Sequence, residues 1–185
     1  MKNQILGLFS ALLMVFAMTT NAQAQDLENT LYMDLATGRV VIELRPDLAP
    51  QHVARIKELT RQGFYNGLVF HRVIEGFMVQ TGDPTGTGTG GSGKKLKAEF
   101  SNEPHVRGAV SMARASDPDS GDSQFFIVLQ DSTFLDRQYT VFGRVTKGME
   151  YVDAIKKGNP QNNGMVTNPD KIITLRVAAD VKEAK

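Results

Sequence analysis

Residues 70–83 read FHRVIEGFMVQTGD and are the most informative stretch of the chain. It has the pattern of a β-hairpin. A β-branched and aromatic run over 69–74 is followed by a Glu75-Gly76 turn, and a second apolar run ends at Gln80. The stretch therefore predicts two antiparallel strands that are neighbours in a sheet.

The hairpin contains one cation among apolar side chains. Because side chains alternate faces along a strand, we expect Arg72 to share a face with Phe70, and Met78 with Gln80. Phe77 would lie at the edge of the turn. An arginine in apolar surroundings is costly unless a ligand or partner uses it. The alternative is an arginine whose aliphatic stem packs on the sheet while its guanidinium stays in water, and the hairpin alone leaves both open.

The N-terminal segment has the features of a secretory signal. Lys2 precedes an apolar stretch over 5–18, and Ala22-Gln23-Ala24 supplies the small-x-small pattern of a cleavage site. The stretch is shorter than the roughly 20 residues that a membrane span needs. We therefore expect residues 1–24 to be a cleaved signal peptide and residues 25–185 to form one mature domain. An uncleaved anchor helix is the alternative.

Composition excludes several classes of function. The formal net charge is +1, and removal of residues 1–24 takes away one lysine and no acid, which leaves a neutral chain. Such a chain has no electrostatic signature for nucleic acid or for an anionic membrane. It contains no cysteine, so disulfides, thiol catalysis and thiolate metal sites are excluded.

Alternating apolar residues and turn signals predict many short strands. The expected strands cover 31–35, 39–44, 69–74, 77–81, 109–112, 124–129, 140–146 and 171–177. Pro50 opens a helix that Gly63 closes, and a second helix is expected over 149–157. The region 159–170 is polar and rich in turn residues, so we expect a surface loop. These elements predict a mainly β fold, a closed antiparallel barrel capped by two helices.

One expected strand is apolar on both faces. In the run 123–129 every residue after Gln124 is apolar, whereas a barrel strand needs only its inner face apolar. The second face, which holds Gln124 and Phe126, must be covered by a helix or must line a groove. The sequence pattern leaves both open.

Five blocks of sequence resemble the cyclophilin-type peptidyl-prolyl cis–trans isomerases, and the resemblance covers nearly the whole mature chain. The blocks are Phe70-His71-Arg72 with Gly76–Gln80, Gly88–Gly91, Ser111–Ala113, Ser123–Ile127, and Leu135-Asp136 with Val141–Gly143. They occur in the family's order and with similar spacing. The resemblance implies an eight-stranded antiparallel barrel, two capping helices and an active groove on the outer face of the barrel. It also implies catalysis of rotation about X–Pro bonds without a cofactor or a metal.

The resemblance also implies roles for individual residues. Arg72 corresponds to the family's catalytic arginine, and Gln80 and Phe77 are expected to act beside it. The expected substrate-binding residues are Met78, Gly88, Ala113, Arg114, Gln124, Phe126, Phe134, Leu135 and Tyr139. The apolar members of the set would form a pocket for the proline ring, while Gln80 and Gln124 would orient the substrate backbone.

Three positions depart from the pattern of the animal members. Phe134 replaces the groove tryptophan, Arg114 replaces an asparagine and Tyr139 replaces a histidine. The first change puts binding of cyclosporin-type inhibitors in doubt, because phenylalanine lacks the indole N–H donor. The second is expected to alter which residue is preferred before the proline.

Three other kinds of site are weaker interpretations. Gly86–Gly91 matches the dinucleotide motif G-x-G-x-x-G, but no helical pattern follows it. His52, His71 and His105 are too widely spaced to predict a metal site, and His71 is expected to make a structural hydrogen bond in the barrel. Gly121–Phe125 lacks the final glycine of the serine-hydrolase motif G-x-S-x-G.

The sequence therefore predicts an exported, disulfide-free prolyl isomerase that assists the folding of other exported chains. We expect a monomer in the periplasm, with secretion as the second choice. Its partners would be unfolded or flexible proline-containing polypeptides, with no nucleic acid and no stable membrane anchor. The alternative is a holdase that binds proline peptides with incidental turnover, and only Arg72 argues for chemistry over binding.

Overall fold

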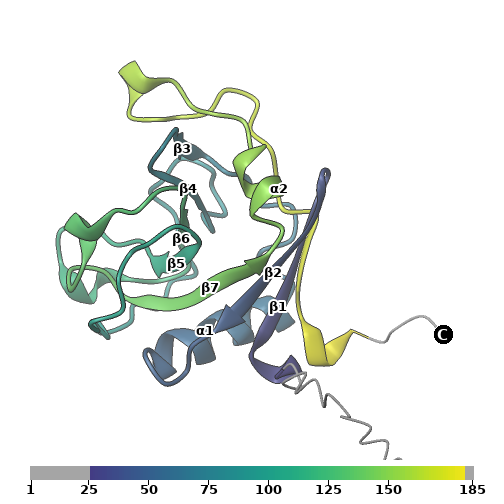
Figure 1. The fold of residues 1–185 in the computed structure, drawn as a ribbon, viewed down its shortest axis with the longest axis vertical. Helices are drawn as coiled ribbons and strands as arrows, with labels where there is room; N and C mark the ends of the chain where they lie inside the picture. The colour runs from purple at the N-terminus through teal and green to yellow at the C-terminus, as the bar shows by residue number, and fades with distance from the viewer. Residues whose placement is uncertain (1–25, 182–185) are drawn as a thin grey trace, which may run out of the picture.

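Eight antiparallel strands form one curled sheet in the computed structural model, which describes residues 26–181 (Figure 1). The strands are β1 (Thr30–Leu35), β2 (Gly38–Leu44), β3 (Arg72–Ile74), β4 (Met78–Thr81), β5 (Ala109–Met112), β6 (Phe125–Val128), β7 (Val141–Lys147) and β8 (Thr174–Val177). Short 3-10 helices cover Leu27–Asn29, Pro118–Ser120, Thr133–Leu135, Pro160–Asn162 and Ala178–Asp180. The signal peptide predicted over 1–24 lies outside the described residues.

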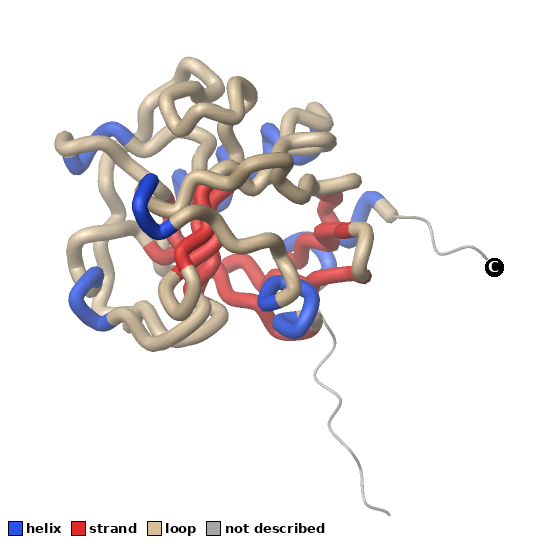
Figure 2. The backbone as a smooth tube through the Cα atoms, turned by 90° about the horizontal axis from the view of Figure 1, so that it is seen from above, coloured by secondary structure: helices blue, strands red, loops and turns tan. Residues whose placement is uncertain are grey.

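The strands follow the order β3-β4-β6-β5-β7-β2-β1-β8 across the sheet, and long loops wrap around them (Figure 2). The ladder is open between its edge strands β3 and β8, so the prediction of a closed barrel is slightly overstated. Backbone hydrogen bonds nevertheless join the segments that lead into those edges, from Phe70 N to Asp170 O and from Ile172 N to Leu68 O, both 2.9 Å. The prediction of a mainly β, eight-stranded antiparallel fold with two helices is confirmed.

The predicted hairpin is formed by β3 and β4. Arg72 pairs with Gln80 across the two strands, and a hydrogen bond of 3.0 Å from Phe77 N to Ile74 O closes the turn. Gly76 adopts a φ of 69° in this turn, a value that costs glycine little because it has no Cβ. Since β4 also pairs with β6, the hairpin is tied into the sheet on one side.

Phe70 and Arg72 lie on opposite faces, so the prediction that they share one is wrong. Phe70 is fully buried in the barrel core, whereas Arg72 lies on the outer face of the sheet. Regular pairing begins only at Arg72, and the backbone of Phe70 bonds to Asp170 instead. This irregular segment ahead of β3 interrupts the alternation on which the prediction depended.

Helix α1 (Pro50–Arg61) packs against β7 and β8 (Figure 1). It buries an apolar face made by Val53, Ile56 and Leu59. Arg55, a charged residue of the same helix, is buried as well. Its guanidinium donates to Glu58 Oε2 and to Ser92 Oγ, both at 2.8 Å, so a polar contact joins the helix to the loop that follows Gly91.

Helix α2 (Met149–Asp153) is shorter than the predicted 149–157. The N–H of Lys156 donates to the Asp170 carboxylate at 2.8 Å instead of continuing the helix. A partner 14 positions further along the chain therefore ends this helix. Within residues 26–181 no helix has the length and apolar character needed to span a bilayer.

Apolar side chains form two clusters, one on each face of the sheet. The smaller, outer cluster consists of Met78, Ala109, Phe126, Val128 and Leu135, with Ile74, Phe77, Ala113 and Tyr139 packed against it. Strand β6 contributes side chains to both clusters. Phe125 and Ile127 belong to the larger cluster, and Phe126 and Val128 belong to the smaller one. The second face of β6, for which the sequence left two possibilities, lines a groove.

Candidate active site

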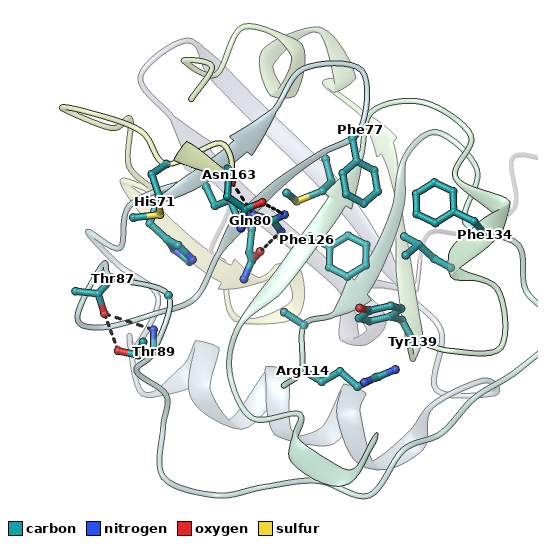
Figure 3. A pocket seen from close by; sticks show the side chains of 16 residues that line it. His71, Phe77, Gln80, Thr87, Thr89, Arg114, Phe126, Phe134, Tyr139 and Asn163 are labelled. Atoms are coloured by element: carbon teal, nitrogen blue, oxygen red, sulfur yellow. Dashed lines mark hydrogen bonds between the residues drawn. The ribbon is translucent and has the colours of Figure 1, made fainter. Parts of the chain in front are cut away.

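A groove of about 550 Å³ opens on the outer face of the sheet (Figure 3). Its lining residues are His71, Arg72, Phe77, Met78, Gln80, Thr87, Gly88, Thr89, Ala113, Arg114, Phe126, Phe134, Leu135, Tyr139, Asn163 and Met165. The structure brings eleven of the twelve expected site residues to this groove. The twelfth, Gln124, lines an adjoining cavity that shares Gln80 and Gly88 with it.

Arg72 is partly buried in the groove and is held by three neutral acceptors. Its Nε donates to the main-chain oxygen of Asn163 at 3.0 Å, and its Nη2 donates to Asn163 Oδ1 at 3.0 Å. Its Nη1 donates to Gln80 Oε1 at 3.1 Å. A guanidinium carries five N–H donors, so two remain for a ligand.

The charge of Arg72 has no carboxylate partner among the described residues. Burial lowers the pKa of Arg72 from its ordinary value, but arginine titrates so far above neutrality that the group stays protonated. A full positive charge that no acidic side chain neutralises therefore lies in the groove.

Two glutamine amides connect Arg72 to the glycine-rich segment 83–91. Gln80, which accepts from Arg72, donates through Nε2 to Gln124 Oε1 at 2.9 Å. Gln124 in turn donates through Nε2 to the carbonyls of Gly88 (3.1 Å) and Gly90 (2.8 Å). The chain of bonds fixes the amide orientations and gives Gln80 a role in supporting Arg72 that the sequence did not predict.

The opposite side of the groove is apolar. Met78, Phe126 and Leu135 are each less than one-tenth exposed and form its floor. Phe77 and Phe134 flank it, with ring centroids 5.5 Å apart, and Phe134 is 65% exposed. The combination of a buried apolar floor and an open aromatic edge suits a small apolar ring that enters from solvent.

The buried ring of His105 packs against Phe126. The ring of His105 stacks on Phe126 at 6.2 Å, and its nitrogens contact Asp136 Oδ1 (2.9 Å) and Ser111 Oγ (3.0 Å). These three residues have the composition of a hydrolase triad. However, Ser111 is fully buried and donates its hydroxyl to Thr140 O at 3.0 Å, so it cannot act as a nucleophile on a bound substrate.

Arg114 forms part of the rim. Its guanidinium carbon lies 4.7 Å from the centroid of the Tyr139 ring, within the range of a cation–π contact. Nε donates to Gln138 O and Nη1 to Ala115 O, both at 2.9 Å. These carbonyls orient the side chain without neutralising it, so the rim carries a second positive charge.

The glycine-rich segment is organised by an internal carboxylate. Asp83, which is 1% exposed, accepts from the main-chain N–H groups of Thr85 (2.7 Å), Thr87 (3.1 Å), Gly88 (2.6 Å) and Gly90 (3.2 Å). Burial opposes ionisation, but these bonds together lower the pKa of Asp83 to about 2. The N–H groups that a phosphate would need are already occupied, which argues against a nucleotide site.

His71 lines the groove, and the structural hydrogen bond predicted for it is a poorly aligned contact with the backbone of Val69. The residue is 2% exposed, and within the described part of the chain neither ring nitrogen has a hydrogen-bond partner of good geometry. Burial lowers the pKa of His71, an effect that the Asp83 carboxylate opposes and the Arg72 cation reinforces. The ring is therefore neutral at pH 7.

The serine-hydrolase and metal-site interpretations are compared with the structure in the same way. Ser123, the serine of the incomplete hydrolase motif, is fully buried and donates to Gly82 O at 2.8 Å. Over residues 26–181, no three or more His, Cys, Asp or Glu side chains are grouped to hold a metal ion.

Several lining residues were not predicted from the sequence. They are His71, Thr87, Thr89, Asn163 and Met165. The last two come from the loop 159–170, which the sequence indicated only as polar surface. An Asn-Gly pair at 163–164 signals a turn, but nothing in it indicates a contact with a residue 91 positions away.

Comparisons with known proteins agree with this geometry. The family model described as cyclophilin type peptidyl-prolyl cis–trans isomerase/CLD matches residues 30–177. A Brucella suis biovar 1 protein named "Probable peptidyl-prolyl cis-trans isomerase" is 55% identical over 173 residues, which cover 87% of this chain and 88% of that protein. A Helicobacter pylori peptidyl-prolyl cis–trans isomerase is 44% identical over 147 residues, covering 76% and 90% of the two chains.

Solved structures show the same fold. Cyclophilin AquaCyp293 from Hirschia baltica has a TM-score of 0.76 and 29% identity, covering 85% of this chain and 77% of that one. A Cryptosporidium parvum cyclophilin type isomerase, crystallised in the presence of the dipeptide Ala-Pro, has a TM-score of 0.74 and 28% identity, covering 80% and 98%. The chain belongs to the cyclophilin-type peptidyl-prolyl cis–trans isomerase family.

Proposed function

We propose that the groove accelerates rotation about X–Pro bonds through Arg72. Amide resonance sets a barrier of about 18–20 kcal/mol for this rotation. The barrier falls when the prolyl nitrogen stops conjugating with the carbonyl, and its lone pair then accepts a hydrogen bond. A donor that bonds this lone pair only in the twisted state stabilises the transition state selectively. The two free N–H groups of Arg72 are such donors.

The apolar side of the groove would bind the proline ring. Met78, Phe126 and Leu135 offer a buried floor beside the cation, so the ring and the guanidinium would lie on either side of the imide nitrogen. The Cryptosporidium parvum relative, crystallised in the presence of Ala-Pro, supports a proline dipeptide unit as the bound group. Positioning and the exclusion of water would share the catalytic effect with the hydrogen bond.

The observation that carries this proposal is an ionised Arg72 with two unused N–H groups beside an apolar pocket. The test compares the wild type with Arg72→Ala on one labelled X–Pro peptide, by a spectroscopic isomerisation assay and a binding titration. We expect turnover to fall at least about 100-fold while peptide affinity changes little. Near-normal turnover in Arg72→Ala would remove the assigned role. Wild-type binding without turnover would favour a holdase.

We further propose that the substrates are exported polypeptides and that the protein acts as a monomer in the periplasm. The support for export is the signal-peptide pattern over residues 1–24, and secretion is the second choice. N-terminal sequencing of the protein from fractionated cells is expected to begin at Gln25. Full-length protein in the membrane fraction would contradict export with cleavage.

A further inference from the structure

We propose that Asn163 is a positioning residue that fixes the orientation of Arg72 while leaving its charge intact. This inference rests on the proposed catalytic role of Arg72. Asn163 supplies two of the three acceptors on the guanidinium, one from its main chain and one from its side chain. Because these two acceptors bind Nε and Nη2, they hold one edge of the planar group at two points. Rotation about the terminal bonds of Arg72 would then break both contacts.

The loop that carries Asn163 is fixed to β3 by its backbone. Val73 N donates to Gly164 O at 2.8 Å, and Gly158 N donates to Val73 O at 2.9 Å. A Cβ at Gly164 would lie 2.5 Å from Ile74 Cγ1, so the close approach of the loop to β3 requires glycine there. The anchor and Arg72 therefore belong to one hydrogen-bonded unit, although they lie 91 positions apart.

The chemical nature of the anchor matters as much as its place. A carboxylate would orient a guanidinium equally well but would offset its charge, and a cationic donor makes a stronger hydrogen bond than a neutral one. The amide of Asn163 and the amide of Gln80 orient Arg72 without that loss. Neutral acceptors around an uncompensated cation are the arrangement expected where the charge itself is used.

The chain offers a matched control for a test. Asn163 and Asn168 both adopt left-handed backbone conformations, with φ of 49° and 52°, and both are exposed in the same loop. Asn168 does not line the groove. Replacement by glycine keeps this backbone conformation accessible at either site. The variant Asn163→Gly removes the side-chain acceptor and keeps the main-chain oxygen, and Asn168→Gly controls for the backbone freedom that glycine adds.

The experiment measures turnover and peptide affinity for Asn163→Gly, Asn168→Gly and Arg72→Ala, and for the Asn163→Gly, Arg72→Ala double variant. We expect Asn163→Gly to lose about tenfold in turnover with unchanged affinity, and Asn168→Gly to match the wild type. In the Arg72→Ala background, Asn163→Gly should have no further effect, because the group that it positions is absent. That background is assayed at enzyme concentrations high enough to exceed the spontaneous rate.

Three outcomes would overturn the inference: equal turnover in the two glycine variants, a loss that persists in the Arg72→Ala background, or a loss that appears only as weaker peptide binding. Normal turnover in Arg72→Ala alone would instead overturn the proposed catalytic role, so the two failures are distinguishable.

Discussion

At the scale of single residues, the groove chemistry depends on groups whose charge does not change near neutral pH. Arg72 remains protonated throughout this range. Burial lowers the pKa of His71 below its ordinary value near 6.5, so the neutral ring predominates above that pH. We therefore expect turnover to be flat between about pH 6.5 and 8, measured by a direct spectroscopic assay that needs no coupling protease. A change in turnover with an apparent pKa near 6.5 to 7 would indicate proton transfer and contradict the mechanism.

A second residue-scale prediction concerns Arg114 on the rim. Arg72 and Arg114 are both cationic, and among residues 26–181 no carboxylate lines the groove. Peptides with Glu next to the proline should therefore be turned over about threefold faster than those with Lys at low ionic strength, and salt should reduce the difference. Arg114→Gln should reduce this preference, and Arg72 should maintain the remainder. Arg137→Gln, a change at an exposed arginine outside the groove, should leave the preference unchanged, and an undiminished preference in Arg114→Gln would contradict the assignment.

At the scale of elements, the glycine-rich segment 83–91 depends on one carboxylate. The folded-state pKa of Asp83 is about 2, below the value of about 3.9 in an unfolded chain. Such a group contributes stability above pH 4, and the contribution is lost as the pH falls toward 2. Asp83→Asn should therefore lower the free energy of unfolding by about 2–3 kcal/mol at pH 7 and by much less at pH 2. Denaturant unfolding at both pH values checks this, and an equal difference at both would contradict it.

The elements themselves could be predicted where the deciding signals are local. The hairpin of β3 and β4 followed from alternation and one glycine turn, and β5 has its predicted bounds. Long-range partners decided the rest. Asp170 ends α2 because its carboxylate accepts the N–H of Lys156. The loop that carries Asn163 was predicted only as polar surface. The groove residues could be predicted as members of one site because a resemblance between motifs assigned them to it. Their spacing along the sequence alone could not have indicated this.

At the scale of the whole molecule, one face of the sheet packs the stabilising core and the other face forms the groove. Ile127 and Phe126 are neighbours on β6. Ile127 is fully buried in the larger, inner cluster, whereas Phe126 belongs to the smaller, outer cluster that lines the groove. Ile127→Ala should lower the free energy of unfolding by about 2–4 kcal/mol and leave turnover per folded molecule unchanged. Phe126→Ala should lose turnover and peptide affinity even where circular dichroism shows it fully folded.

This pair of variants tests whether the sheet acts as a rigid support for the groove. The chain has no disulfide, so packing of the inner cluster must hold the strands in register while the outer face stays open to a substrate. Assays at a low temperature, where both variants are folded, separate lost activity from lost protein. If Ile127→Ala then reduces turnover as much as Phe126→Ala does, the inner core controls the groove geometry, and the two faces are not independent.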